Sequence, residues 1–201
     1  MAFTFFFRDR HTLEQLTSLL IPSTEGFSKI KVWDAGCANG AEPYTFAIIL
    51  AEALGHGPYK KVQITASDID ETSNFREIIQ NGVYPKSDLS RMPENIFENY
   101  FHKYDENNHY RINDIIRNSV EFHQHDLLTL KPIDRGFNAI ICKNVLLHFQ
   151  PIERIEVFKM FHSVLAPGGF LTTEQTQQLP DECKPLFHKV VTDANVYQKI
   201  G

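Results

Sequence analysis

Small residues and a carboxylate surround the turn that follows the first predicted strand. In the segment VWDAGCANG, Asp34 ends an apolar strand, and Gly36 and Gly40 lead from there into a helix. Small side chains at such a turn let the backbone approach a ligand closely, as in nucleotide-binding turns. The spacing differs from the GxGxxG of dinucleotide-binding enzymes. A tight strand-to-helix turn without a ligand would use the same residues, so the turn alone leaves both interpretations open.

Two further carboxylates stand at the ends of later predicted strands. Asp68, in ASDID, can accept hydrogen bonds from both hydroxyls of a ribose. Asp126, in HDLL, can accept the exocyclic amine of an adenine, with Leu127 against the ring. Asp70 is predicted to cap a helix instead. Because the sequence holds no phosphate-binding lysine loop, these residues predict an adenosine cofactor without a pyrophosphate.

Strands and helices alternate through most of the chain and position these residues. Strands are predicted at KIKVWDAG, at KVQITASDID, before Asp126, and at FNAIICKNVLLHF, a continuous apolar run typical of a strand buried on both faces. The last strands are predicted at FLTT and VVTDANVYQKI. Helices are predicted from Thr12 to Leu20, before Pro22, and at EPYTFAIILAEALG and IERIEVFKMFHSVL. This alternation predicts an α/β fold with a mostly parallel, doubly wound sheet.

Length, net charge and cysteine content limit the classes of function that this sequence fits. The 201 residues suit one domain, 1–201, and a net charge of -5 without a Lys/Arg cluster argues against a nucleic-acid partner. The three cysteines form no CxxC pair, which fits a reducing compartment, and Cys37 is interpreted as a small packing residue. No apolar run approaches the length of a membrane helix, about 18 to 20 residues, and MAFTFFF is too short for a signal peptide. We therefore expect a cytoplasmic protein without membrane insertion.

A metal site is the remaining alternative for one pair of histidines. His123 and His125 alternate on one predicted strand face, next to Asp126. No further ligand follows at a recognisable spacing, so we expect no metal.

Five segments in a fixed order carry a resemblance to a known family. They are VWDAGCANGAEPYTFA, ASDID, VEFHQHDLL, FNAIICKNVLLHF and LAPGGFL. Together they resemble the CheR family, the chemoreceptor glutamate O-methyltransferases, over essentially the whole chain. The resemblance implies a Rossmann-like S-adenosylmethionine (SAM) methyltransferase fold, with a mostly parallel central sheet, helices on both faces and a small antiparallel β insertion at about residues 100–122. It also implies SAM as the methyl donor, S-adenosylhomocysteine (SAH) as the product, and glutamates in the cytoplasmic helical region of a chemotaxis receptor as acceptors.

The resemblance assigns site residues position by position. It implies that the methionine end of SAM lies near Gly36 and Glu42, the ribose on Asp68 and the adenine by Asp126. Glu42 opens a predicted helix, where the dipole favours a carboxylate, and it can accept hydrogen bonds from a ligand ammonium. The residues expected to bind SAM are Thr4, Arg8, Gly36, Glu42, Asp68, Asp126, Leu127, Asn144 and Val145. Those expected to take part in catalysis are Arg8 and His148.

The first 22 residues are expected to form a lid segment followed by a helix. The family carries an arginine in a TxFFR segment at the methyl-donor site, and TFFFR here places Thr4 and Arg8 there. The phenylalanines would then pack against the sheet and the helix at Leu13–Leu20; the alternative is that they only close an edge of the core. Because the chain begins almost at this segment, we expect the catalytic domain alone, without the family's usual N-terminal helical domain.

Some positions depart from the family's pattern. Ala2 replaces an asparagine, His148 replaces a tyrosine, and EQTQ at residues 174–177 replaces a GHSE-like stretch. Glycine is absent between Tyr84 and Arg135, so tethering by a receptor tail peptide, which uses a glycine-rich hairpin, is not expected. These departures leave three hypotheses: a SAM-dependent protein-glutamate O-methyltransferase, the same fold and cofactor acting on another protein or a small carboxylate, or a non-catalytic module that binds SAM or SAH.

Overall fold

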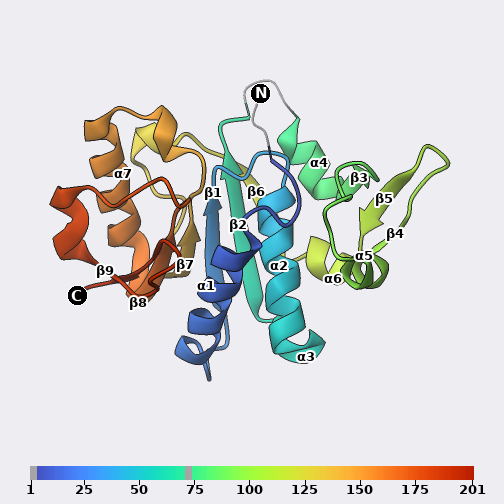
Figure 1. Ribbon diagram of the computed structural model, residues 1–201, viewed down its shortest axis with the longest axis horizontal. Helices are drawn as coiled ribbons and strands as arrows, with labels where there is room; N and C mark the ends of the chain where they lie inside the picture. The colour runs from blue at the N-terminus through green and yellow to red at the C-terminus, as the bar shows by residue number, and fades with distance from the viewer. Residues whose placement is uncertain (1–3, 71–73) are drawn as a thin grey trace.

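The structure is a computed structural model that describes residues 4–70 and 74–201. Its central sheet is built from β1 (Ile30–Ala35), β2 (Val62–Asp68), β6 (Val120–Gln124), β7 (Phe137–Ile141), β8 (Leu165–Thr172), β9 (Phe187–Lys189) and β10 (Val196–Lys199). The seven strands have the order β6-β2-β1-β7-β8-β10-β9 (Figure 1). The first five in this order are parallel, and β10 is antiparallel to both of its neighbours. The predicted mostly parallel α/β sheet is confirmed.

Helices cover both faces of the sheet, and the sheet separates two hydrophobic cores. They are α1 (Arg10–Ser23), α2 (Ala41–Leu54), α3 (His56–Tyr59), α4 (Phe75–Asn81), α5 (Glu94–Tyr100), α6 (Asp114–Arg117) and α7 (Pro151–Val164), with short 3-10 helices η1 (Leu127–Thr129), η2 (Leu146–His148) and η3 (Asp181–Leu186). α1 and α2 join Val32 in one core (Figure 1), and α7 joins Trp33 in the other. Neighbouring residues of β1 thus enter opposite cores, as the alternation of side chains along a strand requires. β7 is buried at every position, which agrees with a strand covered by helices on both faces.

A second, antiparallel sheet lies to one side of the main sheet (Figure 1). Its strands β3 (Val83–Pro85), β5 (His109–Ile112) and β4 (Phe101–Lys103) are adjacent in that order. The predicted small antiparallel insertion is present, but its first strand precedes the expected range of 100–122. β3 contains Pro85, and a proline is tolerated here because β3 is an edge strand. The end of the expected range belongs instead to β6, which pairs with β2 in the main sheet.

Several element ends differ from the sequence prediction. The predicted strand FNAIICKNVLLHF ends at Ile141, and its last part forms η2 instead. α1 continues past Pro22 to Ser23. In the segment VVTDANVYQKI only Val196–Lys199 forms a strand, β10, and it pairs with β8 and β9. Asn195 explains the break, because its side-chain amide donates to the carbonyl oxygens of Glu174, Gln175 and Gln177 and holds this stretch as a loop.

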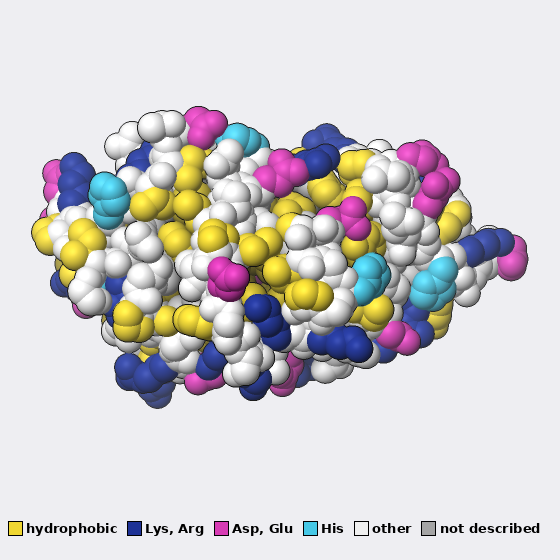
Figure 2. Space-filling model, turned by 90° about the horizontal axis from the view of Figure 1, so that it is seen from below, with side chains coloured by type: hydrophobic (Ala, Val, Ile, Leu, Met, Phe, Trp, Pro, Cys, Tyr) yellow, Lys and Arg dark blue, Asp and Glu magenta, His cyan; other side chains and the backbone are white. Residues whose placement is uncertain are grey.

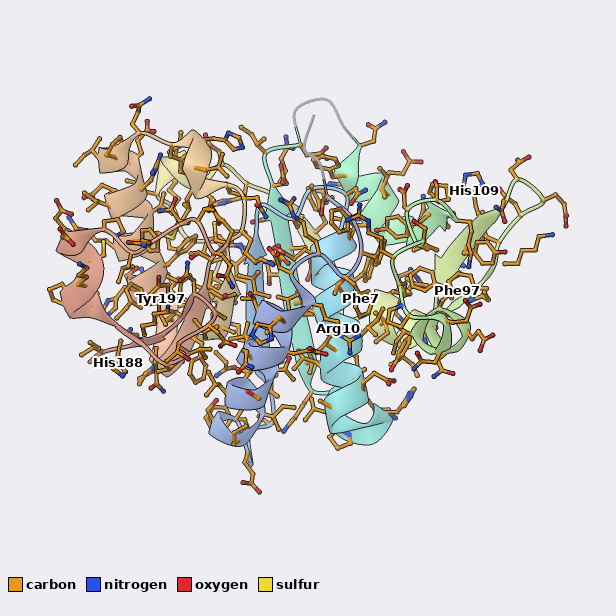
Figure 3. The ribbon with its side chains drawn as sticks, viewed as in Figure 1. Phe7, Arg10, Phe97, His109, His188 and Tyr197 are labelled. Carbon is orange, nitrogen blue, oxygen red and sulfur yellow. The ribbon has the colours of Figure 1, made fainter. Side chains whose placement is uncertain are left out.

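The segment before α1 enters the core through one of its phenylalanines. Phe6 is fully buried, and its ring centroid lies 4.9 Å from that of Tyr84 and 5.7 Å from that of Phe101, both in edge-on geometry. The aromatic contacts of Phe6 are therefore with the small sheet. Phe7 is half-buried beside α2 (Figure 3), and its N–H donates to Thr45 Oγ1 at 3.0 Å. Residues 1–3, including Ala2, lie outside the described part of the chain.

Replacing Phe6 with alanine is expected to lower the free energy of unfolding by about 3 to 5 kcal/mol, because it empties a closed aromatic site. The half-buried Phe5 is the matched control, for which a loss of about 1 kcal/mol is expected. Urea unfolding measures both. Equal losses would contradict the core role of Phe6. A deletion of residues 1–8 would remove this core residue together with Thr4 and Arg8, so point variants separate stability from function.

The surface carries charges of both signs. Figure 2 shows the molecule from below, with Lys and Arg side chains interspersed among Asp and Glu. Among the described residues, no helix combines the length and the apolar character that crossing a membrane requires.

Candidate functional site

The site lies where several parallel strands end. The order of the sheet reverses at β1, which has β2 on one side and β7 on the other. In open α/β sheets, ligands bind at such a point, outside the carboxyl ends of the strands. A cavity of about 530 Å³ is lined by residues that follow β1, β2, β6 and β7. Every site residue expected from the sequence lines it: Thr4, Arg8, Gly36, Glu42, Asp68, Asp126, Leu127, Asn144, Val145 and His148.

Gly36 allows two loops of the site to meet. Its φ of +95° lies in the left-handed region, and a Cβ added there would stand 2.1 Å from Val145 Cγ2. Only glycine satisfies both the conformation and the close approach. The N–H groups of Gly36 and Cys37 donate to the carbonyl oxygen of Ser67, at 2.7 and 3.0 Å, which ties the turn to the end of β2. The cavity therefore depends on this turn for its shape.

Cys37 lies in the same turn as a buried thiol. Burial raises the pKa of Cys37 well above its ordinary value, and the neighbouring carboxylates Asp34 and Asp68 raise it further. The thiol is therefore protonated at neutral pH, which agrees with the packing role expected of it.

Three carboxylates at the ends of strands are each held by backbone N–H groups of the loops around the cavity or of the start of α4. Asp68 Oδ2 accepts the N–H of Ala38 at 2.9 Å, and Asp126 Oδ1 accepts that of Leu128 at 2.8 Å. These bonds orient the two side chains at the cavity. Asp70 instead accepts the N–H groups of Phe75 and Arg76 at the start of α4, at 2.9 and 3.3 Å, which confirms its predicted capping role.

Buried charges form one wall of the cavity. Glu42, in the first turn of α2, pairs through Oε2 with Lys143 Nζ at 3.1 Å, and Asp9 Oδ2 lies 3.3 Å from the same nitrogen. Burial raises the pKa of Glu42, and the Lys143 ammonium offsets part of the increase. Burial alone would lower the pKa of Lys143, but the two carboxylates outweigh it and raise the pKa. Lys143 was not among the site residues expected from the sequence, although it is a single charge inside the apolar run FNAIICKNVLL.

Asp34 lies behind this wall at the end of β1. Its side chain is fully buried, and neither carboxylate oxygen has a hydrogen-bond partner within the described residues. Burial raises the pKa of Asp34 well above its ordinary value, and the nearby Glu42 carboxylate raises it further. These effects favour the protonated form of Asp34.

The N-terminal segment closes another side of the cavity. Arg8 Nη2 donates to Asn144 Oδ1 at 2.9 Å, so a residue before α1 contacts one that follows β7. Asn144 has a positive φ of 60°, and its N–H donates to Glu174 Oε2 at 2.9 Å. Glu174 is buried, and it was not predicted as a site residue; here it fixes the loop that carries Asn144.

The mouth of the cavity carries exposed apolar side chains. Ile69 and Leu147 line the cavity and are 46% and 45% exposed. Between Leu147 and Phe149, which also line it, His148 ends η2. This combination of a polar interior and an apolar rim suits a charged ligand inside and a second molecule that contacts the rim.

Comparison with known proteins gives the family. A family model described as CheR methyltransferase, SAM binding domain, matches residues 2–196. The chain belongs to the CheR methyltransferase family. Chemotaxis protein methyltransferases of Borreliella burgdorferi and Listeria innocua are each 30% identical to it over 176 residues. The matches cover 84% and 87% of this chain but only 61% and 64% of those proteins, so the chain spans less than two thirds of the length of these curated relatives.

A solved structure shares the fold of this CheR-family chain. The magnesium protoporphyrin IX methyltransferase of Synechocystis, solved with SAM bound, aligns with a TM-score of 0.50 at 16% identity, over 94% of this chain and 76% of that one. This similarity confirms the expected SAM methyltransferase fold. SAM is accordingly the cofactor of the CheR domain that this chain matches.

The two histidines considered as metal ligands have other partners. His123 Nε2 lies 3.3 Å from Glu121 Oε1, and His125 Nε2 bonds the carbonyl oxygen of Lys131 at 2.7 Å. Within residues 4–70 and 74–201, no group of three or more His, Cys, Asp or Glu side chains is arranged to hold a metal ion. The chemistry of the cavity rests on its carboxylates and cations.

Proposed function

We propose that this CheR-family chain is a SAM-dependent protein-glutamate O-methyltransferase, and that its acceptor is a glutamate in the cytoplasmic helical region of a chemotaxis receptor. The observation that supports this proposal most strongly is the convergence of the expected residues, from Thr4 to His148, on one cavity at the reversal point of the sheet. The names of the similar proteins agree with it. A cytoplasmic location follows from the proposed substrate.

The residues at the cavity fit the parts of SAM. Asp68 is proposed to accept from the ribose hydroxyls, and Asp126 from the adenine amine with Leu127 against the ring. Each carboxylate is already oriented by a backbone N–H: that of Ala38, in the turn after β1, for Asp68, and that of Leu128 for Asp126. Glu42 is proposed to accept from the ammonium of the methionine part. Gly36, where a Cβ would collide with Val145, leaves the backbone exposed to the ligand, and Asn144 and Val145 complete the wall.

Methyl transfer from SAM to a carboxylate depends more on the positioning of the two reactants than on acid-base catalysis. Bound SAM supplies an electrophilic methyl group on a sulfonium. A glutamate acceptor is already ionised at neutral pH, so the chain needs no general base. Arg8, held by Asn144, is proposed to orient the acceptor carboxylate, and His148 to line its approach. The segment before α1 then serves as a lid that keeps water from the reacting groups.

Two departures support a second candidate, a different acceptor with the same cofactor. His148 replaces a tyrosine at the cavity, and EQTQ at 174–177 stands next to the loop of Asn144, through the bond from the Asn144 N–H to Glu174. His148 thus lines the cavity directly, and Glu174 acts on its lining through Asn144. A small carboxylate or a glutamate of another protein would use the same cofactor residues.

Transfer of tritium from labelled SAM to chemoreceptor cytoplasmic fragments tests the first candidate. We expect base-labile label, released as methanol, that disappears when the modified glutamates of the fragment are changed to glutamine. Label on other proteins or small carboxylates alone would favour the second candidate. Binding of SAH without any transfer would support a binding module instead, and absence of SAH binding would contradict all three. Truncating the receptor tail peptide is expected to leave transfer unchanged.

A further inference from the structure

A buried lysine joins two elements of the site that no sequence signal connects. The Lys143 side chain is 0% exposed, and its Nζ contacts Glu42 of α2 and Asp9 at the start of α1. A buried ammonium is costly unless charged partners compensate it. Both of its partners belong to segments that line the cavity, since Glu42 is a lining residue and Asp9 follows Arg8 directly. The pairing therefore concerns the site as well as the stability of the fold.

The Asp9 carboxylate contacts Lys143 and does not cap α1, although Asp9 stands at the N-cap position. It is the N-cap of α1, where an aspartate side chain normally accepts an N–H of the first turn. Its side chain makes no capping hydrogen bond, and its φ is 49°. A positive φ outside glycine has a local conformational cost. Two unfavourable local features at one residue indicate that the contact with Lys143 determines the conformation of Asp9.

Glu42 forms the other end of the link. Its charge state responds to Lys143, Asp9 and Arg8, and it lies near Asp34 and the thiols of Cys37 and Cys142. Lys143 is the strongest of these influences that lowers the pKa of Glu42. A protonated Glu42 could not form an ion pair with a ligand ammonium. Loss of Lys143 would therefore extend the protonated form to higher pH.

We propose that Lys143 is a positioning residue for cofactor binding: it fixes the Glu42 carboxylate at the cavity wall and, through Asp9, ties the Thr4–Arg8 segment to the same point. The inference rests on the proposed function, because it needs SAM or SAH in this cavity. The Lys143 ammonium then holds both Glu42, which is proposed to accept from the methionine part of SAM, and the segment that carries Arg8. Lys143 also lines the cavity, but its ammonium contacts these two carboxylates, so the proposed role does not require it to touch the ligand.

Calorimetry with SAH between pH 6 and pH 8.5 tests the link to Glu42. In Lys143→Met, the affinity is expected to fall as the pH falls, by up to about tenfold per unit below the pKa of Glu42, because one proton competes with the ligand. The wild type should change less over the same range, and Lys143→Arg should restore most of its profile. Lys31→Met is the matched control: it removes a lysine paired with Asp134 at 2.6 Å outside the cavity, and its profile should follow the wild type.

A second variant keeps the proposal testable if Lys143→Met does not fold. Asp9→Asn changes a side chain that is 38% exposed and leaves the pair between Lys143 and Glu42 intact. We expect amide hydrogen exchange of the Thr4–Arg8 segment, measured by mass spectrometry, to become severalfold faster than in the wild type. A Lys143→Met profile parallel to the wild type, or unchanged exchange of this segment in Asp9→Asn, would overturn the inference. A wild type that fails to bind SAH would overturn the proposed function instead.

Discussion

Asp68→Ala is expected to weaken SAH binding by a factor of about 100, which corresponds to about 3 kcal/mol. The carboxylate stands at the end of β2 and lines the cavity, with one oxygen fixed by the N–H of Ala38. Its loss would remove a charged acceptor from both ribose hydroxyls and leave the Ala38 N–H without this partner. Calorimetric titration with SAH measures the effect. Asp68→Asn should fall between the wild type and alanine, because an amide oxygen still accepts but carries no charge.

Asp70→Ala is the control for this prediction. Asp70 lies two residues further on but does not line the cavity, and it caps α4. Its replacement should lower stability by about 1 kcal/mol and leave SAH affinity near that of the wild type. Unchanged binding by Asp68→Ala, or an equal loss in both variants, would remove Asp68 from the cofactor site and with it the main support for an adenosine ligand.

Part of the cavity lining was predictable from strand order. Parallel strands end at one edge of a sheet, so residues after β1, β2 and β6 had to meet there once the α/β alternation was recognised. That reasoning placed Gly36, Asp68 and Asp126 without any knowledge of distances. Thr4, Arg8 and His148 came from the family resemblance alone. No periodicity or spacing connects Arg8 with Asn144, which is 136 positions away.

Buried charge and short strands were the parts that the sequence did not reveal. Lys143 is a single charge in a largely apolar run, and its partners Asp9 and Glu42 reach it only through tertiary packing. Glu174 was noted as a departure from the family, but its bond to the Asn144 N–H depends on where β7 and β8 end. β3 has three residues including Pro85, too few for an alternating pattern, and the pairing with β5 decides its conformation.

Arg8→Ala is expected to lower kcat about 100-fold, with a smaller change in SAH affinity. Arg8 lines the cavity, its guanidinium is held by Asn144 Oδ1, and it is proposed to orient the acceptor carboxylate there. A planar donor can orient a carboxylate by two hydrogen bonds, whereas a lysine supplies a point charge without that geometry. Arg8→Lys should therefore recover only part of the rate. Single-turnover transfer from labelled SAM to the receptor fragment separates this step from binding.

Arg10 provides a matched control for the loss of an arginine in the same segment. It lies two residues further on, on α1 (Figure 3), and its Nε pairs with Glu14 at 2.7 Å on an exposed surface outside the cavity. Arg10→Ala removes the same charge from the same part of the chain, so its kcat should stay near that of the wild type. A large loss in both variants would mean that the net charge of the segment matters more than the position of Arg8. Full activity in Arg8→Ala would show that the acceptor carboxylate is oriented by other groups, of which His148, another lining residue, is a candidate.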